Sequence, residues 1–223
     1  RWMVDSSKDM GTYLQSSIHG NLGYIGLAVS YYFLGQEGFA QAGILAGFLM
    51  LFQNIMAVLI LQFNREGEEK SGNIASTMKM VWGNPVIVSA VAGMLFSLSN
   101  LPIPVLVERT LSIVSGMALP LALLVIGASL SFHLIRHYLL PTLSSSFLKL
   151  IVLPAVGFWF YRAFGFSPEQ FLPGLILLAT PTATITYIMA QEMHGSEELA
   201  SSNVSLSTLI SAPTFILWLS LLT

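Results

Sequence analysis

The chain has 223 residues, of which 54% are hydrophobic and 9% are charged, and its formal net charge is −2. Soluble proteins carry about a quarter charged residues, so the composition excludes an ordinary soluble domain and indicates a membrane protein. The absence of cysteine excludes a disulfide framework and a thiolate metal site, and the absence of a large basic patch argues against nucleic acid as a partner.

Seven apolar segments with few charges predict membrane-spanning helices, because roughly 20 helical residues cross a ~30 Å hydrocarbon core. We therefore predict an all-α polytopic membrane protein. The expected spans are 12–34, 39–62, 85–98, 106–132, 141–162, 169–193 and 199–222. The first is broken near Gly20 and Asn21, and the sixth is interrupted by Pro173 and Pro181. Pro120 is expected to kink the fourth.

The charge distribution predicts the orientation of these spans. The side that holds the N-terminal end would collect six basic residues, Arg1, Lys8, Arg65, Lys70, Lys79 and Arg136, against Arg109 and Arg162 on the other side. Basic loops stay inside, so we expect that side to be cytoplasmic and the C-terminus to lie outside the cytoplasmic (inner) membrane. The two broken spans are then an odd number of crossings apart and run in opposite directions.

The two broken segments also form an internal repeat. At an offset of 160 residues, a Gly-x-Glu-x-x-Ala turn begins at Gly35 and again at Gly195, and Ile25, Leu49 and Leu59 coincide with Ile185, Leu209 and Leu219. Broken apolar segments in corresponding positions of an inverted repeat are the sequence pointer to the binding site of a secondary transporter.

This repeat suggests a division of the chain into three parts. Residues 1–63 form the end of a first inverted repeat, 64–84 form a cytoplasmic connector, and 85–223 form a second, five-helix repeat. Because the chain begins at Arg1 rather than at Met, we expect an N-terminal portion to be missing.

Five stretches carry a resemblance to a known family: 20–27 (GNLGYIGL), 120–130 (PLALLVIGASL), 149–154 (KLIVLP), 181–191 and 206–211 (LSTLIS). Through them the sequence resembles the auxin efflux carrier (PIN-like) family of membrane transport proteins, in its short-loop prokaryotic form. The resemblance implies ten helices in two inverted five-helix repeats, with helices four and nine crossing where they unwind. This chain would supply helices four to ten. Ala28 lies where the family often has Pro, and the second break has Thr182, Thr184 and Thr186 where the family commonly has a second Pro or an Asn.

The first break offers several candidate binding residues. Asn21 can offer its amide to a substrate carboxylate, beside backbone N–H groups freed around Gly23, or it only caps a half-helix. Tyr24 faces the cavity or packs against a neighbour. Gln53 and Asn54, in the second span, line the cavity or bond a neighbouring helix. His19 beside the break can titrate near neutral pH or serve structurally.

At the second break, Pro181 removes a backbone donor and exposes carbonyl groups. The hydroxyls of Thr180 and Thr182 can satisfy those groups or a ligand, although threonines in membrane helices often bond their own backbone. Tyr187, like Tyr24, is a candidate for the cavity wall.

Lys149 is the only charged residue well inside a predicted span. An ionisable group in a membrane segment is a functional hypothesis by default, and Lys149 could balance a substrate anion or replace a coupling cation. Alternatively, its long side chain snorkels to the cytoplasmic surface.

These features predict a secondary active or facilitative transporter of a small organic anion, such as a carboxylate or an auxin-like compound, working by alternating access at a crossed-helix midplane site. The partners expected are that anion, the lipid bilayer and a homodimer partner. No cofactor is predicted, and coupling to H⁺ or Na⁺ stays open. The alternatives are a seven-helix receptor or sensor, supported by span count alone, and an intramembrane enzyme. The latter is disfavoured because both aspartates, Asp5 and Asp9, precede the first span.

Overall fold

The structure is a computed structural model that describes residue 4, residues 6–65, residue 83, and residues 85–99, 101–129 and 132–221. Regular structure within these ranges is entirely helical, which confirms the all-α prediction for them. In the described part of the chain, three helical stretches are long and apolar enough to cross a membrane: Leu22–Phe63, Leu139–Ala163 and Glu197–Ser220. The total of seven spans stays a prediction, and most of the predicted connector lies outside the described residues.

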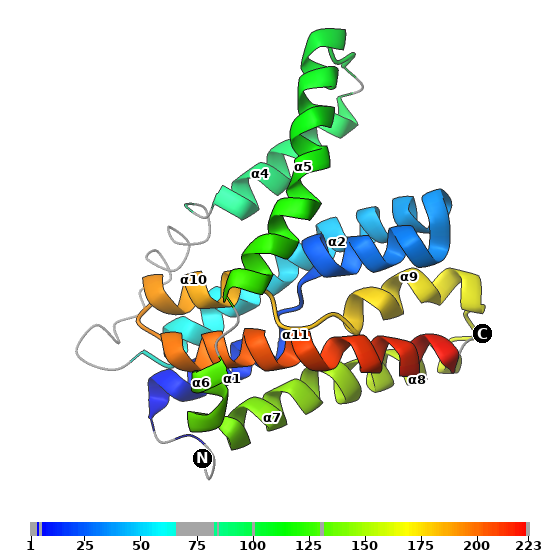
Figure 1. The fold of residues 1–223 in the computed structure, drawn as a ribbon. Helices are drawn as coiled ribbons and strands as arrows, with labels where there is room; N and C mark the ends of the chain where they lie inside the picture. Colours follow the sequence, from blue (N-terminus) through cyan, green and yellow to red (C-terminus); the bar gives the residue numbers. More distant parts are fainter. Residues whose placement is uncertain are drawn as a thin grey trace.

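The first part of the chain forms a broken helix followed by a helical hairpin (Figure 1). Helix α1 (Ser7–Ile18) ends at the break, and the π-helical turn η1 (Leu22–Gly26) leads into α2 (Leu27–Phe63). Gly35 interrupts α2 with φ 70° and ψ −164°, a conformation open essentially to glycine alone. The second arm of α2 then runs back along α1, so that Asn64 lies against Gly11.

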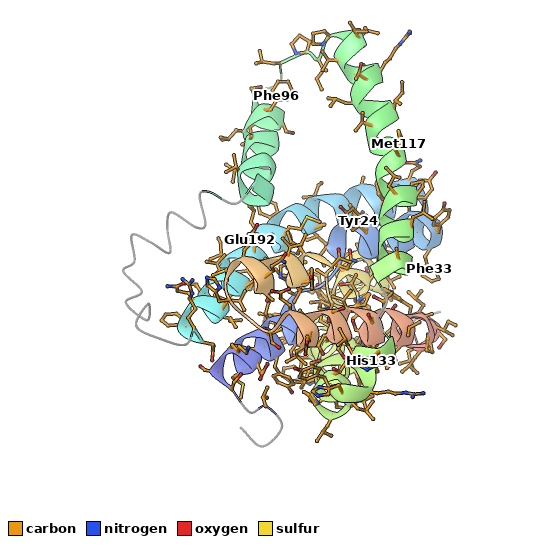
Figure 2. All side chains as sticks on the ribbon, turned by 60° about the vertical axis from the view of Figure 1, so that its left-hand side comes forward. Tyr24, Phe33, Phe96, Met117, His133 and Glu192 are labelled. Atoms are coloured by element: carbon orange, nitrogen blue, oxygen red, sulfur yellow. The ribbon has the colours of Figure 1, made fainter. Side chains whose placement is uncertain are left out.

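Helices α4 (Pro85–Leu98) and α5 (Val105–Ser129) project from the rest of the described molecule, and α6 (Phe132–His137) follows (Figures 1 and 2). Phe96 on α4 and Met117 on α5 are about half exposed, as expected where apolar helices meet lipid rather than water. Helix α5 continues through Pro120.

A long rod is formed by α7 (Leu139–Phe147), the π-helical turn η3 (Leu148–Val152) and α8 (Leu153–Ala163). Pro154 has no N–H to donate to the carbonyl of Leu150. The indole N–H of Trp218 donates to that carbonyl instead, at 2.8 Å. The wider π turn therefore lies where proline disturbs the helix, and it carries Lys149.

The last part of the chain forms a second broken helix, α9 (Pro168–Leu178) and α10 (Ile185–Glu192), followed by α11 (Glu197–Ser220). Phe171 of α9 and Trp218 of α11 belong to one buried cluster, and the partly buried Phe158 of α8 packs against it. The predicted interruption at Pro173 is wrong, because α9 is continuous there. Pro173 has no N–H to donate to the carbonyl of Glu169, so one helical hydrogen bond is lost. That carbonyl lies in the first turn of α9, where the helix end is exposed.

The two broken helices follow the offset expected from the repeat, since α1 ends at Ile18 and α9 at Leu178 (178 − 18 = 160). The turns after them differ. In the second, the residue with positive φ is His194 (φ 59°) rather than Gly195. The N–H of Gly195 donates to the carbonyl of Ala190 at 2.7 Å and closes the helix in a Schellman-type cap. The shared turn motif therefore predicts a turn at both places but not its geometry.

Candidate functional site

The two breaks meet and pair through their backbones. The N–H of Asn21 donates to the carbonyl of Pro181 at 2.8 Å, and the N–H of Ala183 donates to the carbonyl of His19 at 2.9 Å. These bonds form an antiparallel bridge between Gly20 and Thr182. An unpaired backbone group costs several kcal/mol in lipid, so each break supplies partners that the other needs. We call this point the crossing.

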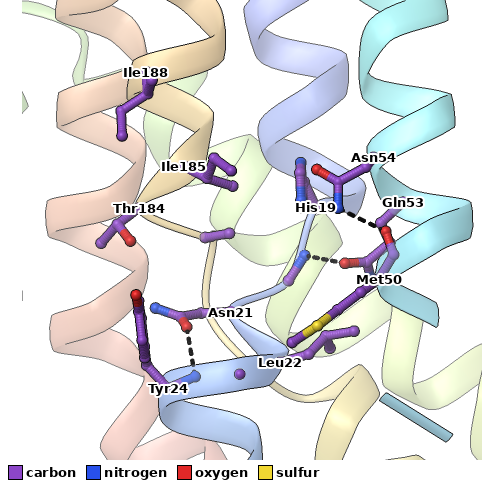
Figure 3. A pocket seen from close by; sticks show the side chains of 13 residues that line it. His19, Asn21, Leu22, Tyr24, Met50, Gln53, Asn54, Thr184, Ile185 and Ile188 are labelled. Carbon is purple, nitrogen blue, oxygen red and sulfur yellow. Dashed lines mark hydrogen bonds between the residues drawn. The ribbon is translucent and has the colours of Figure 1, made fainter. Parts of the chain in front are cut away.

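Gln53, on the second arm of α2, closes the first break from the side. Its Oε1 accepts the N–H of Gly20 at 3.2 Å (Figure 3). Its Nε2 donates to the carbonyl of Ile18, also at 3.2 Å. Both ends of the amide are therefore occupied by backbone groups. The sequence left two alternatives for Gln53, a place in the cavity wall or a bond to a neighbouring helix. Gln53 bonds the neighbouring segment, and it also lines the cavity.

The hydroxyls of the second break are also occupied by the protein. Thr180 Oγ1 donates to the carbonyl of Leu177 at 2.7 Å, and Thr182 Oγ1 donates to the carbonyl of Ser16 at 2.9 Å. The N–H of Thr182 donates to Ser207 Oγ at 3.0 Å. Sequence reasoning missed the part of Ser207, although it lies in one of the stretches that carry the family resemblance.

A cavity of about 310 Å³ adjoins the first break (Figure 3). This volume lies at the lower end of the range for small-molecule sites. Five of the predicted site residues line it: Asn21, Gly23, Tyr24, Gln53 and Asn54. The lining also includes His19, Gly20, Leu22, Met50, Ala183, Thr184, Ile185 and Ile188. Sequence reasoning did not select Met50, Ile185 or Ile188, since apolar residues in spans carry no distinguishing signal.

The remaining predicted residues do not line this cavity. Thr180, Pro181 and Thr182 are buried in the crossing itself. The hydroxyl of Tyr187 lies 3.4 Å from Glu197 Oε2, in an exposed contact at the end of α10. Three of the residues predicted for the site at the second break therefore hold the crossing without lining the cavity.

Three of the residues that line the cavity have a buried polar atom with no partner among the described residues. Asn21 Oδ1 accepts the N–H of Tyr24 at 3.2 Å, which leaves its Nδ2 unpaired, and Asn54 Nδ2 donates to the carbonyl of Met50 at 2.7 Å, which leaves its Oδ1 unpaired. His19 Nδ1 is unpaired as well. All three side chains are at most 4% exposed. Unpaired buried polar atoms are rare and costly, so they mark a place for a ligand or ordered water.

Lys149 lies at the crossing rather than at a membrane surface. The side chain is fully buried, and its Nζ donates to the carbonyl of Leu178 at 2.7 Å. A Cβ placed on Gly20 would lie 3.1 Å from that Nζ and would overlap the Thr180 hydroxyl. The snorkelling alternative is therefore wrong. Among the described residues no aspartate or glutamate is buried, so no buried carboxylate balances this lysine there.

Comparison with known proteins shows the family of the chain. Residues 5–219 match the family described as "Membrane transport protein". An "Uncharacterized transporter" of Methanothermobacter thermautotrophicus is 25% identical over 216 residues, which cover 96% of this chain and 68% of that protein. A "Putative malonate transporter" of Rhizobium meliloti is 22% identical over 204 residues, 88% of this chain and 62% of that protein. The chain thus spans about two thirds of the length of these relatives.

The match covers nearly the whole chain, so the chain belongs to the membrane transport protein family, as the resemblance to auxin efflux carriers (PIN-like) predicts. Together with its long apolar helices, this family membership describes a multi-pass membrane protein. Both relatives are named as transporters rather than enzymes.

Proposed function

We propose that this protein carries a small organic anion across the cytoplasmic membrane by alternating access, and that the cavity beside the crossing binds the anion. The observation that carries the proposal is the pairing of an unsatisfied amide donor with a buried cation. Asn21 Nδ2 is unpaired at the cavity wall, and Lys149 Nζ lies against Gly20, which also lines the cavity.

Electrostatics favour an anion at this place. A buried ammonium group without a carboxylate is costly, and an anion nearby would offset that cost. The helix that begins at Leu22 contributes the positive end of its dipole to the same cavity. The carbonyl of Leu178, at the end of α9, satisfies one hydrogen of Lys149 but leaves its formal charge unbalanced.

The crossing supplies a fixed point for the transport cycle. The two broken helices meet through an antiparallel bridge, which supports opposite directions through the membrane and hence an inverted repeat. In transporters of that kind the site stays at the crossing while one bundle moves against the other. The proposal includes seven spans that correspond to helices four to ten of the ten-helix fold. It also includes a cytoplasmic connector at 64–84 between the two repeats, and a C-terminus outside the inner membrane.

The substrate class that we propose is a small carboxylate. The relative named as a malonate transporter supports this choice, and the modest volume of the cavity is compatible with such a ligand. Membership in a transport family favours a carrier over the receptor alternative.

The test is uptake of a panel of radiolabelled carboxylates, malonate among them, by proteoliposomes that contain the full-length protein. Asn21→Ser keeps a side-chain acceptor for the N–H of Tyr24 but removes the free amide. We expect it to lower the affinity for the transported anion by roughly 10- to 100-fold, since a hydrogen bond to a charged group is worth about 1.5–3 kcal/mol. Asn64→Ser, outside the cavity, is the control.

Two results would contradict the proposal. One is the absence of uptake of every carboxylate in the panel by the folded protein. The other is an uptake that Asn21→Ser and Asn64→Ser change equally little.

A further inference from the structure

We propose that the ligand of this cavity carries a hydrogen-bond donor in addition to its carboxylate, and that Asn54 Oδ1 receives it. The ligand class is an organic anion with an O–H group, either the hydroxyl of a hydroxy acid or the un-ionised second carboxyl of a dicarboxylic acid. This inference rests on the proposed function and specifies the substrate of the same site.

The orientation of the Asn54 amide follows from its backbone partner. A carbonyl group can only accept, so the nitrogen of the amide must face the carbonyl of Met50, 2.7 Å away. The opposite orientation would place two oxygens against each other. Oδ1 is therefore directed away from its own helix, and it finds no partner among the described residues. Figure 3 shows it on the side that faces the cavity.

The same reasoning assigns the other two amides. The N–H of Tyr24 can only donate, so Asn21 presents its oxygen to Tyr24 and keeps its NH₂ group free. Gln53 uses its oxygen for Gly20 and its nitrogen for Ile18. The amides that line the cavity thus present one free donor, on Asn21, and one free acceptor, on Asn54, and neither can exchange its role by flipping.

A ligand must match both atoms to bind well. A ligand with a carboxylate but no donor accepts a hydrogen bond from the free amide of Asn21. It brings only a second acceptor or an apolar group to Asn54, whose buried oxygen then stays unpaired. A site built to bond a ligand hydroxyl rejects the analogue that lacks it, because its own polar group loses its partner. Asn54 is therefore a residue that determines specificity, while Asn21 contacts the carboxylate common to all ligands.

The chain offers a matched control on the same helix. Asn64 lies ten residues beyond Asn54, and its Nδ2 makes the same bond to the carbonyl four residues earlier, that of Ile60, at 2.8 Å. It lies against Gly11 and does not line the cavity. Asn64→Leu removes the same local bond as Asn54→Leu without touching the proposed site.

The experiment measures dissociation constants by calorimetry on the purified full-length protein, for pairs of ligands that differ in one donor. The pairs are lactate with propionate, malate with succinate, and malonate with its monomethyl ester. The last pair is compared at a pH below the second ionisation of malonate, where both are monoanions and only malonate keeps an O–H group. In at least one pair we expect the ligand with the donor to bind roughly tenfold more tightly. Asn54→Leu should reduce that difference to less than about twofold, mainly by weakening the ligand that carries the donor. Asn64→Leu should keep the difference.

The pairs distinguish the two sources of the donor. A preference for lactate and malate assigns the donor to a hydroxyl group. A preference for malonate over its ester, growing as the pH falls through the ionisation of its second carboxyl, assigns it to the carboxylic acid. Equal affinities within all three pairs would overturn the inference, and so would an Asn54→Leu variant that weakens both members of a pair equally.

These failures differ from a failure of the proposed function. If carboxylates bind, Asn21→Ser weakens them and no pair shows a donor preference, only the role of Asn54 is wrong. If no carboxylate binds the folded protein, the anion site itself is wrong and the inference falls with it.

Discussion

The two breaks are built from different residues and end in different states. In the first, residues 19–21, the side chains of His19 and Asn21 keep unpaired polar atoms beside the cavity. In the second, residues 179–184, the hydroxyls of Thr180 and Thr182 are both donated to backbone carbonyls. The first break therefore keeps unpaired polar atoms, whereas the second mainly holds the crossing together.

The difference comes from what packs against each break. The second break lies against α11 and the end of α1, where Ser207 and the carbonyl of Ser16 supply partners for Thr182. The first break faces Gln53, which satisfies its backbone, and a cavity that supplies nothing for its side chains. The two breaks thus differ in which polar groups the protein itself satisfies, and residue type alone does not predict that difference.

The largest expected effect concerns the opposite directions of the two broken helices. The 223 residues contain no cysteine, so single cysteines can report sidedness. We expect Glu37→Cys, after the first broken helix, to react with a membrane-impermeant thiol reagent in intact cells. Glu192→Cys, at the end of the second, should react only after the membrane is opened. Both positions are exposed. Labelling of both from the same side would rule out the inverted arrangement.

The contact between the breaks can be broken at Gly20. A side chain there would overlap the Thr180 hydroxyl and crowd Lys149, so Gly20→Leu should separate the crossing and abolish uptake, with a fall in the melting temperature of several degrees. Gly43→Ala on α2 is the control, since nothing lies within 4 Å of its added Cβ, and helix propensity predicts a gain of about 0.5–1 kcal/mol. A Gly20→Leu variant that transports normally would contradict the close approach.

Lys149 lies between the two breaks, and its replacement tests the charge at the crossing. Lys149→Met keeps a long apolar stem but removes the cation, so we expect anion uptake to fall by about two orders of magnitude. The free energy of unfolding should change little, because the carbonyl of Leu178 loses its partner while the cost of burying the charge is removed. Lys8→Met, on the exposed face of α1, should change neither. Unfolding of the variant in parallel with loss of uptake would instead indicate a structural role alone.

The smallest effect on transport is expected at the second break. Thr182→Val removes the bond to the carbonyl of Ser16 and should lower the free energy of unfolding by about 1–3 kcal/mol. The dissociation constant of the transported anion should stay within about twofold of the wild-type value, because Thr182 does not line the cavity. Thermal unfolding and ligand titration on the same sample measure both. A large loss of affinity with unchanged stability would move the binding site to the second break.

The positions of both breaks could be predicted from the sequence because their causes are local. Gly20 and Asn21 disfavour a helix, and Pro181 cannot donate to one. The reversal at Gly35 is local as well, since its backbone conformation is open essentially to glycine. Proline content alone overpredicts breaks, as Pro173 demonstrates, because one missing bond near an exposed helix end is tolerated.

Only the tertiary structure decided which hydrogen-bond partner each polar atom has. Thr182 and Ser16 are 166 residues apart, Gln53 and Gly20 are 33 apart, and Lys149 and Leu178 are 29 apart. No local pattern specifies such pairs, because they depend on which helices pack at the crossing. The sequence by itself determined that Asn21, Gln53, Asn54 and Lys149 are polar groups within apolar segments. Packing then gave Gln53 and Lys149 backbone partners and left one atom each of Asn21 and Asn54 without one, since nothing in the described protein fills the space beside them.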